Sequence, residues 1–115
     1  MAYDEELAAR VRELAERSGM REQKMFGGIG FMLGGNMCCG VHGQDLIDRL
    51  AAEESDEALR DPSVRRMDIT GRPMKGWLFV SADGTRTERA LRSWVERAAD
   101  FAGSLPKKTK TKKMR

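Results

Sequence analysis

The stretch GGIGFMLGGNMCCGVHG, residues 27–43, decides how the middle of this chain folds. It holds seven glycines, two methionines, two adjacent cysteines and the only histidine of the chain within seventeen residues. Apolar runs over residues 23–33 and 36–42 are separated by Gly34-Gly35. Glycine accepts the positive φ that a tight turn requires, so this pattern predicts two antiparallel strands joined in a hairpin.

Three further strands are expected downstream of this hairpin. A turn at Gly43-Gln44 leads into residues 45–50, which extends the hairpin into a three-stranded meander. Residues 65–70 and 77–81 are two more strand candidates, and GRPMKG joins them.

Three helices are expected around these strands. Asp4 is an N-cap candidate for a first helix that runs to Ser18, and Gly19 stops it. A short helix is predicted over residues 53–60, with Ser55 as its cap candidate. The capping box Thr85-x-x-Glu88 predicts a last helix that ends at Gly103.

The predicted order of elements is therefore α-β-β-β-α-β-β-α. Helices at both ends and in the middle of a five-stranded antiparallel sheet indicate an α+β fold, a two-layer sandwich whose helices pack on one face of the sheet. A chain of 115 residues forms one core, so we expect a single domain over residues 1–105.

The last ten residues, 106–115, differ from the rest of the chain in charge. Of the 21 basic residues, six lie after Pro106, which leaves 15 basic against 18 acidic residues in 1–105, a net charge of −3. We expect this basic tail to be disordered and solvated. As an alternative function, it could associate non-specifically and weakly with nucleic acid through phosphate contacts. The tail residues concerned are Lys107, Lys108, Lys110, Lys112, Lys113 and Arg115.

No apolar run approaches the length of a membrane span, and the N-terminus is acidic and lacks the features of a signal peptide. Free cysteines also fit a reducing compartment. We therefore expect a cytoplasmic protein without a membrane partner.

The cysteines and the histidine of residues 27–43 raise the question of a metal or catalytic site. Regular strand alternation predicts that Met37, Cys39 and Val41 share one face, while Cys38 and His42 share the other. Cys38 and His42 then stand roughly 13 Å apart, too far for one ion or one proton transfer. The glycine pattern also lacks a phosphate-loop signature. We expect no metal, no cofactor and no catalytic residue, and an enzyme that uses a thiol is the weakest interpretation.

Two segments, KMFGGIGFMLGGNMCCGVHG and MDITGRPMKGWLFV, resemble the N-terminal domain family of the bacterial competence regulator TfoX, also called Sxy. The resemblance extends from about residue 21 to residue 105. It implies a two-layer α/β domain with an antiparallel sheet, similar to secretion chaperones. It also implies a stand-alone regulatory domain linked to transcription regulation, and the family supplies no catalytic residues to transfer.

One surface candidate stands out in the connection between the last two predicted strands. Arg72 and Lys75 flank a proline-restricted turn beside Trp77, and together they could hold an anion or an acidic partner. The alternative is a connecting loop whose Trp77 packs into the core. The first functional hypothesis is accordingly a non-enzymatic module that binds another protein, with a homodimer through a sheet edge or a helix face as a further expectation.

Overall fold

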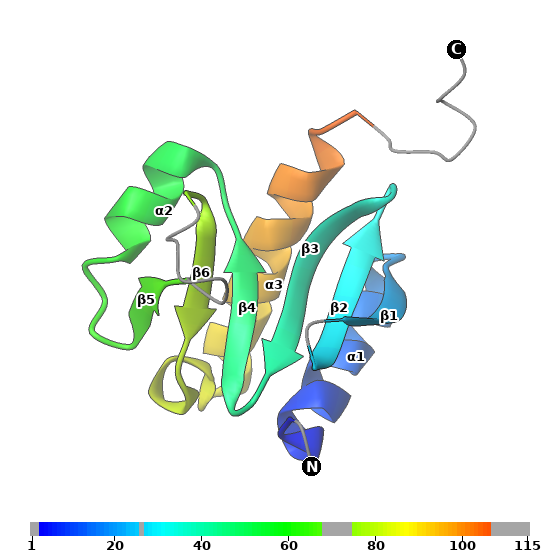
Figure 1. The fold of residues 1–115 in the computed structure, drawn as a ribbon, viewed down its shortest axis with the longest axis horizontal. Coiled ribbons are helices and arrows are strands. Elements are labelled where there is room, and N and C mark those ends of the chain that lie inside the picture. The colour runs from blue at the N-terminus through cyan, green and yellow to red at the C-terminus, as the bar shows by residue number, and fades with distance from the viewer. Residues whose placement is uncertain (1–2, 26, 68–74, 107–115) are drawn as a thin grey trace.

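The computed structural model describes residues 3–25, 27–67 and 75–106. Its centre is an antiparallel sheet of six strands in the order β1-β2-β3-β4-β6-β5 (Figure 1). The strands are β1 (Arg21–Met25), β2 (Gly28–Leu33), β3 (Asn36–His42), β4 (Asp45–Arg49), β5 (Val64–Arg66) and β6 (Trp77–Val80). The helices are α1 (Glu5–Arg17), α2 (Ala52–Ala58), the short 3-10 helix η1 (Ala82–Thr85) and α3 (Glu88–Gly103).

The helices α1 and α3 cover one face of the sheet, behind the strands in the view of Figure 1. Each presents an apolar stripe to the strands, as helical spacing predicts. In α1 the stripe includes Leu7, Val11 and Leu14, and in α3 it includes Leu91 and Val95. The main core lies between these stripes and the central strands, so the α+β class and the two-layer arrangement are confirmed.

The expected count of five strands is wrong, because residues 23–33 form two strands and not one. Gly27 has φ 75°, and Met25 pairs with Gly28 across the turn. An apolar run that contains glycines does not show from its periodicity where the chain reverses. Of the predicted strand over residues 65–70, the structure describes Val64–Arg66 as β5, and residues 68–70 lie outside the described part.

Two of the three predicted helix caps are also wrong. The side chain of Asp4 does accept hydrogen bonds from the backbone of Glu6 and Leu7, as predicted. However, α3 is capped by Thr87, whose hydroxyl accepts from Ala90 N, because Thr85 is already part of η1. Ser55 lies inside α2, where its hydroxyl donates to the Ala52 carbonyl, a local bond that serine makes as readily as a cap.

A β-bulge in β3 overturns the predicted alternation of its side chains. Phe31 pairs with Cys39 and the next residue, Met32, pairs with Met37, so Cys38 is an extra residue. An extra residue shifts every later side chain to the other face. Both cysteines consequently belong to the core under the helices, while Met37 belongs to a second cluster.

The second cluster lies on the opposite face of the sheet, which no described helix covers. We call this face the helix-free face. Met37, Ile47, Met67 and Phe79 form its buried part, and the half-buried Met32 and Trp77 pack against them. The cross-strand pairs Ile47–Phe79 and Met32–Met37 account for this grouping, because paired residues share a face.

Candidate functional site

The chain enters β6 through a turn that is fixed to the end of β4. Leu50 N donates to the carbonyl of Gly76 at 2.8 Å, and Gly76 has φ 88°. A Cβ at Gly76 would stand 2.8 Å from the Leu50 carbonyl oxygen, so only glycine fits there without strain. The predicted site residue Lys75 is exposed next to this turn, and Arg72 lies outside the described residues.

Trp77, the third predicted residue of this site, is half-buried at the start of β6. It packs against the second cluster, as the alternative interpretation proposed, but the residue is only partly buried. Its cross-strand neighbour is Arg49, whose guanidinium carbon lies 4.8 Å from the centroid of the Trp77 ring. The structure therefore adds Arg49 to the predicted site, because the end of β4 pairs with the start of β6. We call this part of the sheet, with Arg49, Lys75 and Trp77, the corner.

Arg49 is held by several groups at once. Its guanidinium lies 5.4 Å from the centroid of the Phe101 ring, and Nη1 donates to the Met37 carbonyl at 3.4 Å. Partial burial lowers the pKa of the Arg49 guanidinium. An arginine still keeps its charge at neutral pH. The corner thus presents a positive charge fixed over an aromatic ring, the arrangement of a cation–π pair.

A second arginine is placed in the same way on this face. The Arg65 guanidinium carbon lies 4.8 Å from the centroid of the Phe79 ring, and Nη2 lies 2.7 Å from Asp45 Oδ2. The His42 ring is tilted against Phe79, with centroids 5.7 Å apart. The helix-free face therefore has an apolar centre and two arginines stacked on its aromatic rings. Sequence reasoning missed Arg49 and Arg65, because only the strand pairing brings them beside Trp77 and Phe79.

The face of the sheet that α1 and α3 cover contains a buried polar group that was not identified from the sequence. Asp48 is 0% exposed, and neither of its carboxyl oxygens has a hydrogen-bond partner among the described residues. Burial first, and the nearby Cys38 second, raise the pKa of Asp48 well above its ordinary value. Burial thus favours the neutral form of the carboxyl, which suits a group without partners among the described residues.

The two thiols beside Asp48 do not have the properties of a nucleophile. Cys38 and Cys39 are free and buried. The adjacent Cys38 side chain and burial raise the pKa of the Cys39 thiol well above its ordinary value, which disfavours the reactive thiolate. Within the described residues, no group of three or more histidine, cysteine or acidic side chains is arranged to hold a metal ion.

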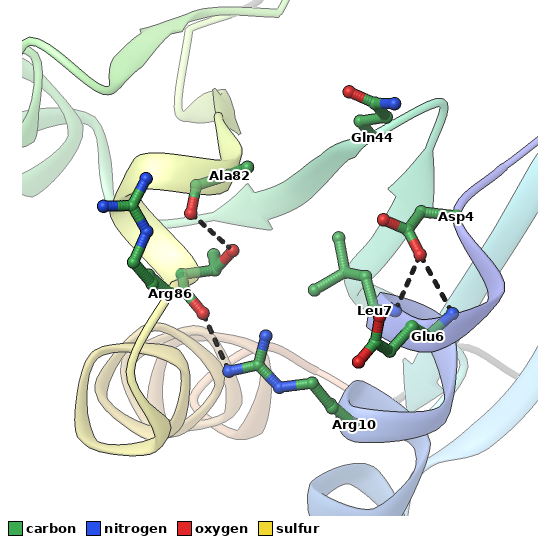
Figure 2. Close-up of a pocket in the computed structure, with 8 residues that line it drawn as sticks. Asp4, Glu6, Leu7, Arg10, Gln44, Ala82 and Arg86 are labelled. Atoms are coloured by element: carbon green, nitrogen blue, oxygen red, sulfur yellow. Dashed lines mark hydrogen bonds between the residues drawn. The ribbon is translucent and has the colours of Figure 1, made fainter.

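A small cavity opens between the start of α1 and η1 (Figure 2). Its volume is about 210 Å³, below the roughly 300 Å³ at which ligand pockets begin. Two of its polar side chains are already engaged, since Arg10 Nη2 donates to the Thr85 carbonyl at 2.8 Å and Asp4 caps α1. Figure 2 shows Arg10 reaching from α1 to η1, so the hydrogen bond beside this cavity connects these two elements.

The predicted tail residues all lie outside the described part of the chain, which ends at Pro106. The carbonyl of Pro106 accepts a hydrogen bond from Asn36 Nδ2 at 2.9 Å, and Asn36 is buried at the start of β3. The tail therefore begins beside the β2–β3 turn. No described helix has the length and apolar character needed to cross a membrane.

The fold and these surfaces define a small α+β domain with an arginine-lined sheet face and, among the described residues, no metal-binding cluster. The model of the TfoX N-terminal domain family matches residues 12–102, and the chain belongs to this family. No curated protein and no solved structure matches the chain.

Proposed function

We propose that this domain is a non-enzymatic regulatory module of the cytoplasm that acts by binding another protein, in a pathway linked to transcription regulation. Membership of the TfoX N-terminal domain family is the observation that carries the proposal. The buried free thiols agree with a reducing compartment. The raised pKa of the Cys39 thiol argues against thiol chemistry.

The helix-free face is the part of the surface that best fits a protein partner. Tryptophan and arginine are the residues most enriched among those that dominate binding energy at interfaces. Here Trp77 is half-buried and Arg49 lies over its ring, so both are already ordered before a partner arrives. Ordered side chains lose less entropy on binding. Arg49, with the exposed Lys75 two residues before Trp77 in the chain, favours an acidic segment of the partner, whereas Arg65 is already paired with Asp45.

The test measures partner binding by variants of this corner. The domain is immobilised, its partner is captured from native lysate and identified, and the purified partner is then titrated. Arg72→Ala with Lys75→Ala, and separately Arg49→Ala, should each weaken affinity at least about tenfold, or about 1.4 kcal/mol. Arg92→Ala on the exposed side of α3 is the matched control and should bind normally. A partner that binds all these variants equally would remove the site from the proposal.

The alternative function is non-specific association with nucleic acid through the basic tail. Six basic residues within ten positions support it, while the net charge of −3 over residues 1–105 opposes a contribution from the body. Counterion release predicts an affinity that falls steeply with salt and little dependence on sequence. Deletion of residues 107–115, which keeps Pro106 and its bond to Asn36, should abolish binding. A truncated domain that binds a DNA duplex as tightly as the full chain at low salt would refute this alternative.

A further inference from the structure

The strand β1 forms one free edge of the sheet, at the opposite end from β5. Its face toward the helices is tied to α1, where Arg12 Nε and Nη2 lie 2.6 and 3.0 Å from the two carboxylate oxygens of Glu22. No described strand pairs with its outer edge. Four consecutive residues along it are exposed: Arg21, Glu22, Gln23 and Lys24. The edge is therefore accessible to another strand.

The hairpin geometry shows which backbone groups of β1 point outward. Met25 pairs with Gly28 across a two-residue connection, and such a connection is closed by a pair that exchanges both backbone hydrogen bonds. Bonded and non-bonded pairs alternate along an antiparallel ladder, so Gln23 also bonds inward, to Gly30. The N–H and C=O groups of Glu22 and Lys24 then face the free edge.

These outward groups restrict how two copies of β1 can pair about a two-fold axis. Antiparallel pairing must place outward-facing residues opposite each other, which leaves three central registers. One places Glu22 opposite Glu22 and another places Lys24 opposite Lys24, and like charges directly opposite are destabilising. The third places Glu22 of each copy opposite Lys24 of the other, with Gln23 on the axis. Only this register satisfies the backbone groups and pairs opposite charges twice.

We propose that a second copy of this chain pairs with the outer edge of β1 in this register, with Gln23 on the two-fold axis. The two six-stranded sheets then continue as one sheet of twelve strands. Each Glu22 carboxylate, already bound by Arg12, also receives the ammonium group of the opposite Lys24. A two-fold interface of this kind is isologous, the commonest arrangement of homodimers.

The other edge of the sheet lacks this self-complementarity. β5 is three residues long and carries Arg65 and Arg66 side by side. Two copies of β5 would bring these like charges together, and short, positively charged edges are a known protection against pairing. The two edges of the sheet therefore differ in charge pattern. The charges of β1 complement those of a second β1, whereas the charges of β5 repel those of a second β5.

This inference is independent of the proposed function. The pairing uses the edge of β1 and leaves Arg49, Lys75 and Trp77 accessible, because these residues lie at β4 and β6. Loss of self-association would leave partner binding intact, and a failed partner experiment would leave the dimer intact. The contact is small, so the dimer should be weak and dependent on concentration.

The first experiment reverses the charges of the edge one at a time. Sedimentation equilibrium of the full chain, up to about 1 mM protein, should show a monomer–dimer equilibrium. Glu22→Lys and Lys24→Glu should each weaken it at least about tenfold, because every cross-strand pair becomes like-charged. An equimolar mixture should restore association as a mixed dimer, since two glutamates on one chain then face two lysines on the other.

The matched controls carry the same changes of net charge elsewhere. Glu88→Lys and Arg92→Glu alter an exposed ion pair on α3 and should dimerise like the unmodified chain. The mixing step separates a lost interface from a misfolded variant, because a misfolded chain would not be rescued. A chain that stays monomeric at about 1 mM, or a mixture that fails to associate, would overturn the proposal.

A second experiment tests the register. Residues directly opposite in a non-hydrogen-bonded pair have Cα atoms about 4.5 Å apart, a spacing that a disulfide spans. In the presence of glutathione disulfide, most molecules of the Gln23→Cys variant should therefore form a covalent dimer. Arg65→Cys, on the β5 edge, is the control and should remain monomeric. Equal cross-linking of both variants, or none of Gln23→Cys, would contradict the two-fold axis at Gln23.

Discussion

Asp48 lies directly opposite Cys39 in the antiparallel pair of β3 and β4, and both residues are 0% exposed. Because of the bulge at Cys38, the second thiol lies in the same core beneath the helices. A carboxyl that has no hydrogen-bond partner among the described residues thus shares the core of the domain with two thiols. The pKa of Asp48, raised first by burial, and that of Cys39, raised by Cys38 and burial, favour the neutral forms of these two groups in the folded state.

The pH dependence of stability should reveal the neutral Asp48. In the unfolded chain an aspartate loses its proton near pH 3.9, whereas in the folded domain the pKa of Asp48 is well above that. Between these two pKa values the unfolded state releases a proton that the folded state keeps, so rising pH lowers the free energy of unfolding. The slope for this one proton is at most about 1.4 kcal/mol per pH unit.

Asp48→Asn removes this proton and isolates its effect. The stability of the Asn variant relative to the unmodified chain should increase as pH rises from about 4 toward the raised pKa, measured by urea unfolding at several pH values. Asp100→Asn, on an exposed position of α3, is the control and should follow the unmodified chain. Parallel profiles for Asp48→Asn and the unmodified chain would show that Asp48 is ionised when folded.

The thiols of Cys38 and Cys39 should react only when the domain opens, because both are buried and free. If labelling requires global unfolding at an ordinary stability of 5–15 kcal/mol, an aromatic disulfide should react at least about a thousandfold more slowly than with an exposed thiol. Denaturant should then release two thiols per chain. Ser93→Cys, exposed on α3, provides the fast reference. Rapid native labelling of either cysteine would reopen thiol chemistry.

The cap of α3 should be Thr87 in solution as well. Its hydroxyl accepts from Ala90 N at 3.1 Å, and loss of such a cap costs about 0.5–2 kcal/mol. Thr87→Ala should therefore lower the melting temperature by several degrees. Asp4→Ala removes the cap of α1 and should have a similar effect, since Asp4 Oδ1 accepts from two backbone N–H groups. A neutral Thr87→Ala would mean that the helix begins elsewhere.

Lys75 and Arg49 should differ in what they contribute to stability. Lys75 is exposed, so Lys75→Ala should change the free energy of unfolding by less than about 0.5 kcal/mol. Arg49 lies over the rings of Trp77 and Phe101 and donates to the Met37 carbonyl. Arg49→Ala should therefore cost about 1–2 kcal/mol. Thermal unfolding of both variants gives the comparison, and equal melting temperatures would show that Arg49 is not held by these contacts.

Only part of the surface site could be identified from the sequence. The motif around residues 71–77 indicated Lys75 and Trp77, because a charged turn beside a tryptophan is visible in a linear pattern. Arg49 is nearly thirty residues away along the chain and joins Trp77 only through the pairing of β4 with β6. The same holds for Arg65, which contacts Phe79 and Asp45 across two strand pairs.

The sequence by itself determined the helices, the α+β class and the antiparallel strands of this domain, except for the reversal between β1 and β2. Apolar periodicity, the cap at Asp4 and glycine turns are local signals, and each acts through the backbone of a few neighbouring residues. Tertiary structure decided the bulge at Cys38, the burial of Asp48 and the arginines over Trp77 and Phe79. These features depend on strand register, and register is a property of two paired segments that neither segment carries alone.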